Sequence, residues 1–204
     1  MDSGELKVIL EKHSEWVHGK EGGARADLSG SDLRGMNLMN ADLGGADLSH
    51  ARLHGANLAG ADLKRAKVRN AGTARANLSG ADLERADLKG ASLTYSQLVG
   101  AKCTGADLSA VDASSAMFVL ADARSAKFRG ANLHSASFQK ANLRNADFTG
   151  ADLTSADFSG ADLRGADLTG ARISNAIFCG TLLGEDAPNG ALCPRWIVQI
   201  APAK

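Results

Sequence analysis

The sequence predicts an all-β solenoid, a chain wound into four-sided coils, with a short helix in front of it. Residues 26–185 divide into 32 consecutive pentapeptides without insertion or deletion, and alanine opens 27 of them. Leucine takes the third place in 20 of the 32. A helix repeats every 3.6 residues and a strand every two, so neither keeps one face apolar at a period of five. A chain that turns a corner every five residues does.

Residues 1–25 are predicted to form an N-terminal cap and linker. Between residues 2 and 18, apolar side chains recur at the spacing of one helix face: Leu6, Ile9, Leu10, His13, Trp16 and Val17. Asp2 and Glu5 have the spacing of a capping box. Because a terminal repeat exposes its core and unpaired backbone, we expect this helix to cover the first coil. The alternative for Trp16 is a contact with a partner.

Residues 26–185 are predicted to form the solenoid itself. The first and third places point inward, and the second place, mostly Asp or Asn, and the fifth, often Gly, suit tight turns. Four phenylalanines follow one another at intervals of 20: Phe118, Phe138, Phe158 and Phe178. Four pentapeptides therefore make one coil, about eight coils make the rod, and equal rings stack in a core ladder. Small third-place residues at Thr73, Cys103, Ala113 and Ala123 predict loose packing in the middle.

The sequence repeat A(D/N)LxG resembles the signature of the pentapeptide-repeat family. That resemblance implies a right-handed quadrilateral β-helix, and the opening helix resembles the N-terminal cap of many members. Its best understood members are resistance proteins, acidic dimeric rods that mimic duplex DNA and bind DNA gyrase. The resemblance therefore implies a DNA-mimicking modulator of gyrase or topoisomerase as an alternative function.

The distribution of charge disfavours that alternative. The chain has 23 basic and 23 acidic residues, hence no net charge. When pentapeptides are assigned to four sides at a period of 20, no side is a continuous acidic column, which a DNA mimic needs. The family's resistance proteins also have loops that leave the coil, whereas the register here is unbroken. We likewise expect no direct binding of nucleic acid.

One side differs from the other three. It consists of every fourth pentapeptide from Met36 to Gly180, and we call it the uncharged side because its only charges are Lys140 and Asp157. It carries an apolar cluster predicted to be a protein-interaction patch, beside an amide ladder of Asn57, Asn77 and Gln97: Val99, Met117, Val119 and Leu120. The alternatives are that these apolar residues are scattered on the surface without a function, or that the stacking of the coils buries them.

Residues 186–204 break the repeat and contain all three prolines of the chain. The apolar run within them is predicted to cover the last coil, with a dimerisation strand or the start of a further domain as alternatives: Trp196, Ile197, Val198 and Ile200. A homodimer through this C-terminal end or through the uncharged side is therefore a possible assembly.

No pattern of catalytic, cofactor-binding or metal-binding residues is present. The five histidines do not have the spacing of a tetrahedral metal set, and a solid rod offers no concavity for convergent groups. The N-terminus lacks the apolar stretch of a secretory signal, and no run is long enough to span a membrane. We therefore expect a cytoplasmic, non-enzymatic scaffold for an unknown protein partner, without cofactor.

Overall fold

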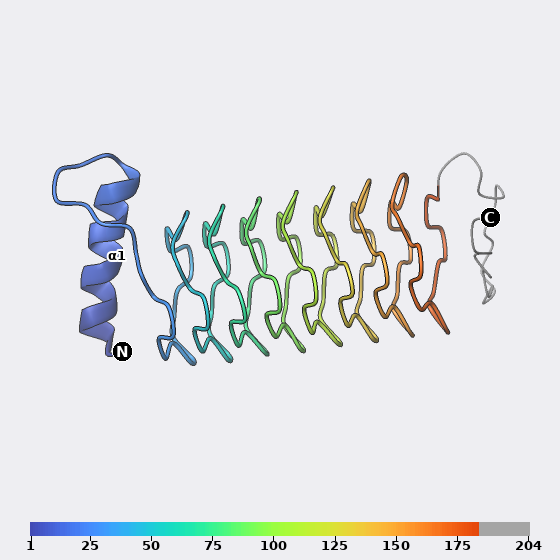
Figure 1. The fold of residues 1–204 in the computed structure, drawn as a ribbon, viewed down its shortest axis with the longest axis horizontal. Helices are drawn as coiled ribbons and strands as arrows, with labels where there is room; N and C mark the ends of the chain where they lie inside the picture. The colour runs from blue at the N-terminus through green and yellow to red at the C-terminus, as the bar shows by residue number, and fades with distance from the viewer. Residues whose placement is uncertain (184–204) are drawn as a thin grey trace.

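The computed structural model describes residues 1–183 and shows one helix followed by a regular β-solenoid (Figure 1). Helix α1 spans Ser3–Val17. The rod that follows contains single-residue parallel β-bridges, which run from Asp27↔Asp47 to Asp162↔Leu182. Each bridge joins the second place of one pentapeptide to the residue 20 positions later. Four pentapeptides therefore complete one coil, and the coils stack in register.

Backbone hydrogen bonds connect each coil to the next at three places of the pentapeptide. The third-place N–H of Leu28 donates to Asp47 O at 2.7 Å, and the N–H of Asp47 donates back to Ala26 O at 3.0 Å. The fifth-place N–H of Gly30 donates to Ser49 O at 2.9 Å. This pattern repeats along the rod, so the backbone of one coil is the template for the next.

A tight turn closes every pentapeptide. The first-place N–H of Ser31 donates to the third-place carbonyl of Leu28 at 3.2 Å, and every fifth place from Gly30 to Gly180 has a positive φ. A positive φ at the third of four turn residues is the signature of a type II turn, which favours glycine. The remaining fourth-place N–H is bonded by the second-place side chain, as when Ser49 N–H donates to Asp47 Oδ1 at 3.1 Å. The recurrent Asp and Asn thus complete the turn.

The core contains the first- and third-place side chains. Phe118, Phe138, Phe158 and Phe178 stack along one wall with successive ring centroids 4.8, 5.0 and 5.2 Å apart. Phe128 faces Phe118 from the opposite wall in an edge-to-face contact at 5.8 Å. Such aromatic pairs add to the stabilisation from burial. The first- and third-place residues are fully buried through most of the rod, whereas Leu168, Ile173 and Phe178 are partly exposed.

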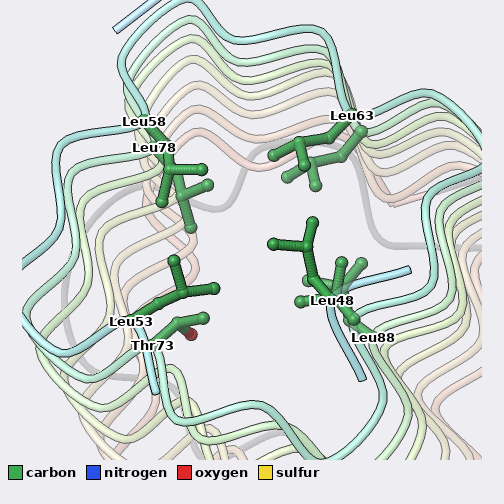
Figure 2. Close-up of a pocket in the computed structure, with 9 residues that line it drawn as sticks. Leu48, Leu53, Leu58, Leu63, Thr73, Leu78 and Leu88 are labelled. Carbon is green, nitrogen blue, oxygen red and sulfur yellow. The ribbon is translucent and has the colours of Figure 1, made fainter. Parts of the chain in front are cut away.

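The expected loose packing is present near Thr73, one of the four small third-place residues. A cavity of about 10 Å³ lies within a cage of leucines, Val68 and Thr73 (Figure 2), which is close to the lower limit for one water molecule. Farther along the rod, Ala113 and Ala123 alternate with Phe118 and Phe128, whose rings are fully buried. The large rings stand beside the small alanines, as close packing of a protein interior requires.

Helix α1 lies against the first coil (Figure 1). Its capping box is formed: Asp2 Oδ1 accepts from the N–H groups of Gly4 and Glu5, and the Glu5 carboxylate accepts from Asp2 N–H. Leu6 is buried in the core, with Ile9 and Leu10 packed against it.

The C-terminal half of α1 differs from the expected apolar face. Trp16 and Val17 are 43% and 44% exposed, because the Trp16 ring lies beside the coil, stacked on His13 at 5.4 Å and next to Gly45. Within residues 1–183, no helix has the length and apolar character needed to cross a bilayer. The predicted cap or dimerisation segment around Trp196 lies outside the described residues.

Candidate protein-interaction site

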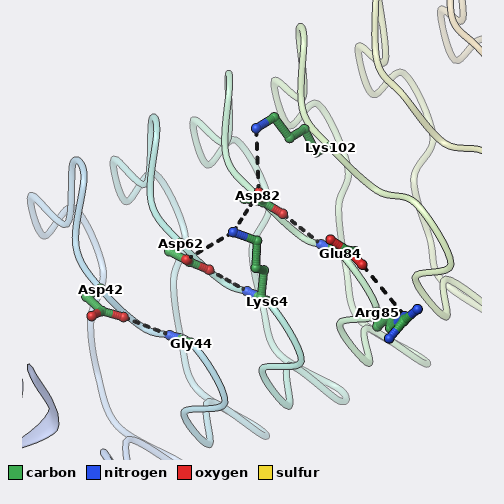
Figure 3. Close-up of polar contacts among 8 residues, drawn as sticks. All are labelled: Asp42, Gly44, Asp62, Lys64, Asp82, Glu84, Arg85 and Lys102. Carbon is green, nitrogen blue, oxygen red and sulfur yellow. Dashed lines mark hydrogen bonds and ion pairs between the residues drawn. The ribbon is translucent and has the colours of Figure 1, made fainter. Parts of the chain in front are cut away.

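Three sides of the rod present charges that are paired with one another. On the side that begins at Ala41, the Lys64 ammonium lies between two carboxylates, 3.4 Å from Asp62 and 3.1 Å from Asp82 (Figure 3). Lys102 approaches Asp82 from the next coil at 3.7 Å. The hydrogen bond to Asp82 is the main cause that raises the pKa of Lys64. Exposed pairs of this kind stabilise only weakly, because water and salt screen them, but they leave no free column of one sign.

The carboxylates of the rod serve the turns and the ion pairs. Arg34, Arg124 and Arg164 each form a two-pronged contact with the Asp two residues earlier. In each case the arginine hydrogen bond is the main cause that lowers the pKa of the Asp. Such carboxylates stay ionised at neutral pH and are poor general acids.

The Cys103 side chain is fully buried in the core. Burial raises the pKa of the Cys103 thiol to about 12, so this thiol stays protonated and unreactive. In the same part of the chain, no three His, Cys, Asp or Glu side chains converge as metal ligands.

The uncharged side is organised by an amide ladder at its N-terminal end. Asn57 Nδ2 donates to Asn37 Oδ1 at 3.4 Å, and Asn77 Nδ2 donates to Asn57 Oδ1 at 3.3 Å. The β-bridges continue this column from Asn77 to Gln97 and from Gln97 to Met117. A column of amides therefore leads directly to an apolar residue, Met117, in the next coil.

The predicted patch lies where this column becomes apolar. Met117 and Leu120 are 44% and 59% exposed, and Val99 and Val119 are half-buried at the corner that follows. The backbone of Gly100 donates to Val119 O at 2.8 Å, so the two valines lie on neighbouring coils. Stacking of the coils therefore does not hide Met117 or Leu120.

Two residues at the opposite corner were missed because they belong to the preceding pentapeptides. Tyr95 is 62% exposed, and the Arg75 guanidinium lies 6.0 Å from its ring centroid. Both take fifth places, the last position before the chain enters the uncharged side, and therefore border Asn77 and Gln97. The signal was available: Tyr95 is the only tyrosine of the chain and stands where glycine is commonest.

These features define a β-solenoid repeat protein with a recurring five-residue unit. The family model described as Pentapeptide repeats matches in eight copies over residues 24–71 and 74–184. The chain therefore belongs to the pentapeptide repeat family.

Solved structures with the same repeat are similar to this chain. HetL, a pentapeptide repeat protein involved in heterocyst differentiation regulation from the cyanobacterium Nostoc sp. strain PCC 7120, is 28% identical; the match covers 92% of this chain and 99% of HetL, with a TM-score of 0.37. QnrB1, a plasmid-mediated fluoroquinolone resistance protein, is 19% identical over 79% and 86% of the two chains, with a TM-score of 0.41. Rfr23 from the cyanobacterium Cyanothece 51142 is 24% identical over 77% and 90%, with a TM-score of 0.27. No sequence among the curated proteins matches.

Proposed function

We propose that this protein is a non-enzymatic scaffold of about eight coils that binds another protein through its uncharged side. The observation that carries the proposal is the exposure of Met117 and Leu120 on a side where, within residues 1–183, neither Lys140 nor Asp157 forms an ion pair. Apolar patches on the surface of a soluble protein often mark contacts. The stacked backbone supports the role as well, since a rigid surface loses little conformational entropy on binding.

A catalytic role has less support. The cavity beside Thr73 in the described core has a volume of about 10 Å³, whereas an active site needs a concave pocket that admits substrate. The carboxylates described above accept hydrogen bonds from turn N–H groups and from arginines, and this structural role does not require them to act as general acids or bases.

A DNA-mimicking role is also less favoured. Lysines take second places between aspartates, as the bridges Asp47↔Lys67, Asp82↔Lys102 and Asp107↔Lys127 show. Each lysine interrupts the negative column that a cationic DNA-binding groove would recognise. A gyrase supercoiling assay with this protein in micromolar excess checks the point, and inhibition or protection would favour the mimic over the scaffold.

The test of the scaffold is the double variant Val119→Lys with Leu120→Glu, used as bait for a pull-down from native cell lysate. Binding of the partner should be lost while the circular dichroism spectrum stays the same. The matched control is Ser109→Lys with Ala110→Glu, which places the same charges at the fourth and fifth places of another side. Retention of the same partner by the Val119/Leu120 variant would contradict the proposal.

A further inference from the structure

Tyr95 and Leu120 are two bulky side chains in a backbone conformation that disfavours them. Their φ values are 57° and 59°, in the left-handed region where a Cβ approaches the following carbonyl. The other described fifth places hold glycine or smaller, polar or charged residues. Tyr95 and Leu120 gain little burial in return, since they are 62% and 59% exposed. Arg65 and Arg85 share this backbone conformation, so what distinguishes Tyr95 and Leu120 is the large apolar surface that they expose, which is typical of a contact site.

The two residues border the same stretch of the uncharged side from opposite corners. Tyr95 precedes Gln97 in one coil, and Leu120 follows Met117 in the next. The bridge Gln97↔Met117 joins these coils directly, at the roughly 4.8 Å spacing of paired strands. The exposed side chains of Gln97 and Met117 therefore lie on this side between the corners of Tyr95 and Leu120. Tyrosine and methionine are both enriched in protein interfaces, and tyrosine is also common among binding hot spots.

Arg75 adds a cation to the edge of this surface. Its guanidinium lies over the Tyr95 ring, 6.0 Å from the centroid. Within the described part of the chain it forms no ion pair, unlike Arg34, Arg124 and Arg164, which each bond an Asp on their own pentapeptide. An arginine held against an aromatic ring keeps its donors free for a carboxylate.

The charges of the uncharged side decide which partner fits. A second copy docked symmetrically would offer Asp157 as its only carboxylate. That carboxylate already accepts hydrogen bonds from Gln139 and Ser159, so a second copy would offer Arg75 an acceptor that it has to share. A partner with its own carboxylate beside an apolar side chain complements both the cation and the apolar centre.

We infer that the surface formed by Arg75, Tyr95, Gln97, Met117 and Leu120 binds an acidic, apolar segment of a partner protein. The segment places an apolar side chain over Met117, between Tyr95 and Leu120, and a carboxylate on Arg75. This inference rests on the proposed function and specifies the chemistry of its partner.

The experiment uses a phage-displayed random peptide library, panned on the full chain at low salt. Enriched peptides should share an Asp or Glu near an aromatic or aliphatic residue. A selected peptide, labelled with a fluorophore, is then titrated with variants by fluorescence anisotropy. Arg75→Ala and Tyr95→Gly should each weaken binding about tenfold or more, as expected for hot-spot residues. Arg75→Lys should restore part of the loss, because the charge remains while the paired donors do not.

Matched controls separate this surface from general charge effects. Arg65→Ala removes an exposed fifth-place arginine at another corner, also at positive φ, and should leave the affinity unchanged. Tyr95→Gly relieves the backbone conformation, so a loss of binding in that variant does not come from misfolding.

Three results would overturn the inference: no enrichment of any peptide, enriched peptides without acidic residues, or affinity indifferent to Arg75→Ala and Tyr95→Gly. A concentration-dependent dimer in sedimentation velocity that Tyr95→Gly abolishes would assign the surface to a second copy instead. Peptides without acidic residues whose binding still requires Val119 and Leu120 would leave the proposed scaffold standing while this inference fails.

Discussion

The Nδ1 atom of His13 accepts a hydrogen bond from the backbone N–H of Ala26 at 3.0 Å, and this bond joins helix α1 to the first residue of the solenoid. His13 is fully buried. Its Nδ1 accepts a hydrogen bond only in the neutral imidazole that carries its proton on Nε2. The attachment of α1 therefore depends on the protonation state of one side chain.

This bond predicts that the cap loses stability in acid. Burial is the main cause that lowers the pKa of His13 from its ordinary 6.5, with Asp42 opposing and Arg25 adding to the effect. Above pH 6.5 the imidazole is neutral in both states and pH has no influence. As pH falls below 6.5, the unfolded chain takes up the proton first, so folding stability falls until the folded-state pKa is passed.

The measurement is hydrogen exchange of the α1 amides between pH 8 and pH 5, corrected for the intrinsic exchange rate. His13→Asn keeps an acceptor for Ala26 N–H but has no titratable group, and should flatten this pH dependence. His13→Leu leaves that N–H without its partner and should destabilise the cap by about 1–3 kcal/mol at every pH. Equal pH profiles for wild type and His13→Asn would remove His13 as the cause.

The phenylalanine stack predicts where the rod is most sensitive to truncation. Phe138 is fully buried between Phe118 and Phe158, with centroids at 4.8 and 5.0 Å. Phe138→Ala should lower the free energy of unfolding by about 3–5 kcal/mol, since it removes contacts and leaves a cavity. Phe178→Ala, at a partly exposed position, should cost clearly less. Urea denaturation compares the two, and equal losses would show that stacking inside the rod adds nothing.

A second-place carboxylate should stabilise the rod more through its hydrogen bond to the turn than through its charge, although Asp152 also lies 3.6 Å from the Arg172 guanidinium. Asp152 Oδ1 accepts from Thr154 N–H at 3.0 Å. Asp152→Ala should destabilise the rod by about 0.5–1.5 kcal/mol, while Asp152→Asn retains the acceptor and should cost less. Ser137→Ala is the control, because Ser137 makes no such bond to Gln139 N–H in the described structure. Thermal denaturation at two salt concentrations checks that the order of the variants does not change with screening.

The fifth-place glycines predict unequal effects of the same substitution. Gly130 has open space around it, and Gly130→Ala should cost only the left-handed backbone conformation, about 1 kcal/mol. At Gly60 a new Cβ would also overlap Asn40 Oδ1, so Gly60→Ala should cost more. Adding Asn40→Gly should bring the Gly60→Ala penalty down to that of Gly130→Ala. A double variant no better than Gly60→Ala alone would contradict the steric explanation.

Much of the solenoid can be predicted from the sequence, because every pentapeptide repeats the same pattern of inward apolar places followed by a turn. The interval between Phe118 and Phe138 predicts four pentapeptides per coil, and the bridges have that register. The exposure of Trp16 could not be predicted, since it depends on how α1 meets Gly45 and not on helix periodicity. The sequence did not place Tyr95 beside the predicted patch for a geometric reason. A corner residue belongs to one pentapeptide in sequence but borders the next side of the rod in space.

Because the bridges join residues 20 positions apart, the number of a residue determines both its height along the rod and the side that it faces. Residues 20 positions apart face the same direction around the axis and differ in height by one coil. Loss of residues 131–150 would shorten the rod by one coil, roughly 4.8 Å, and leave every later residue facing the same way. Loss of a single pentapeptide would instead rotate everything beyond it by a quarter turn and divide each side into two mismatched halves. Changes of length in whole coils are therefore the ones that such a rod can accumulate without redirecting its surfaces.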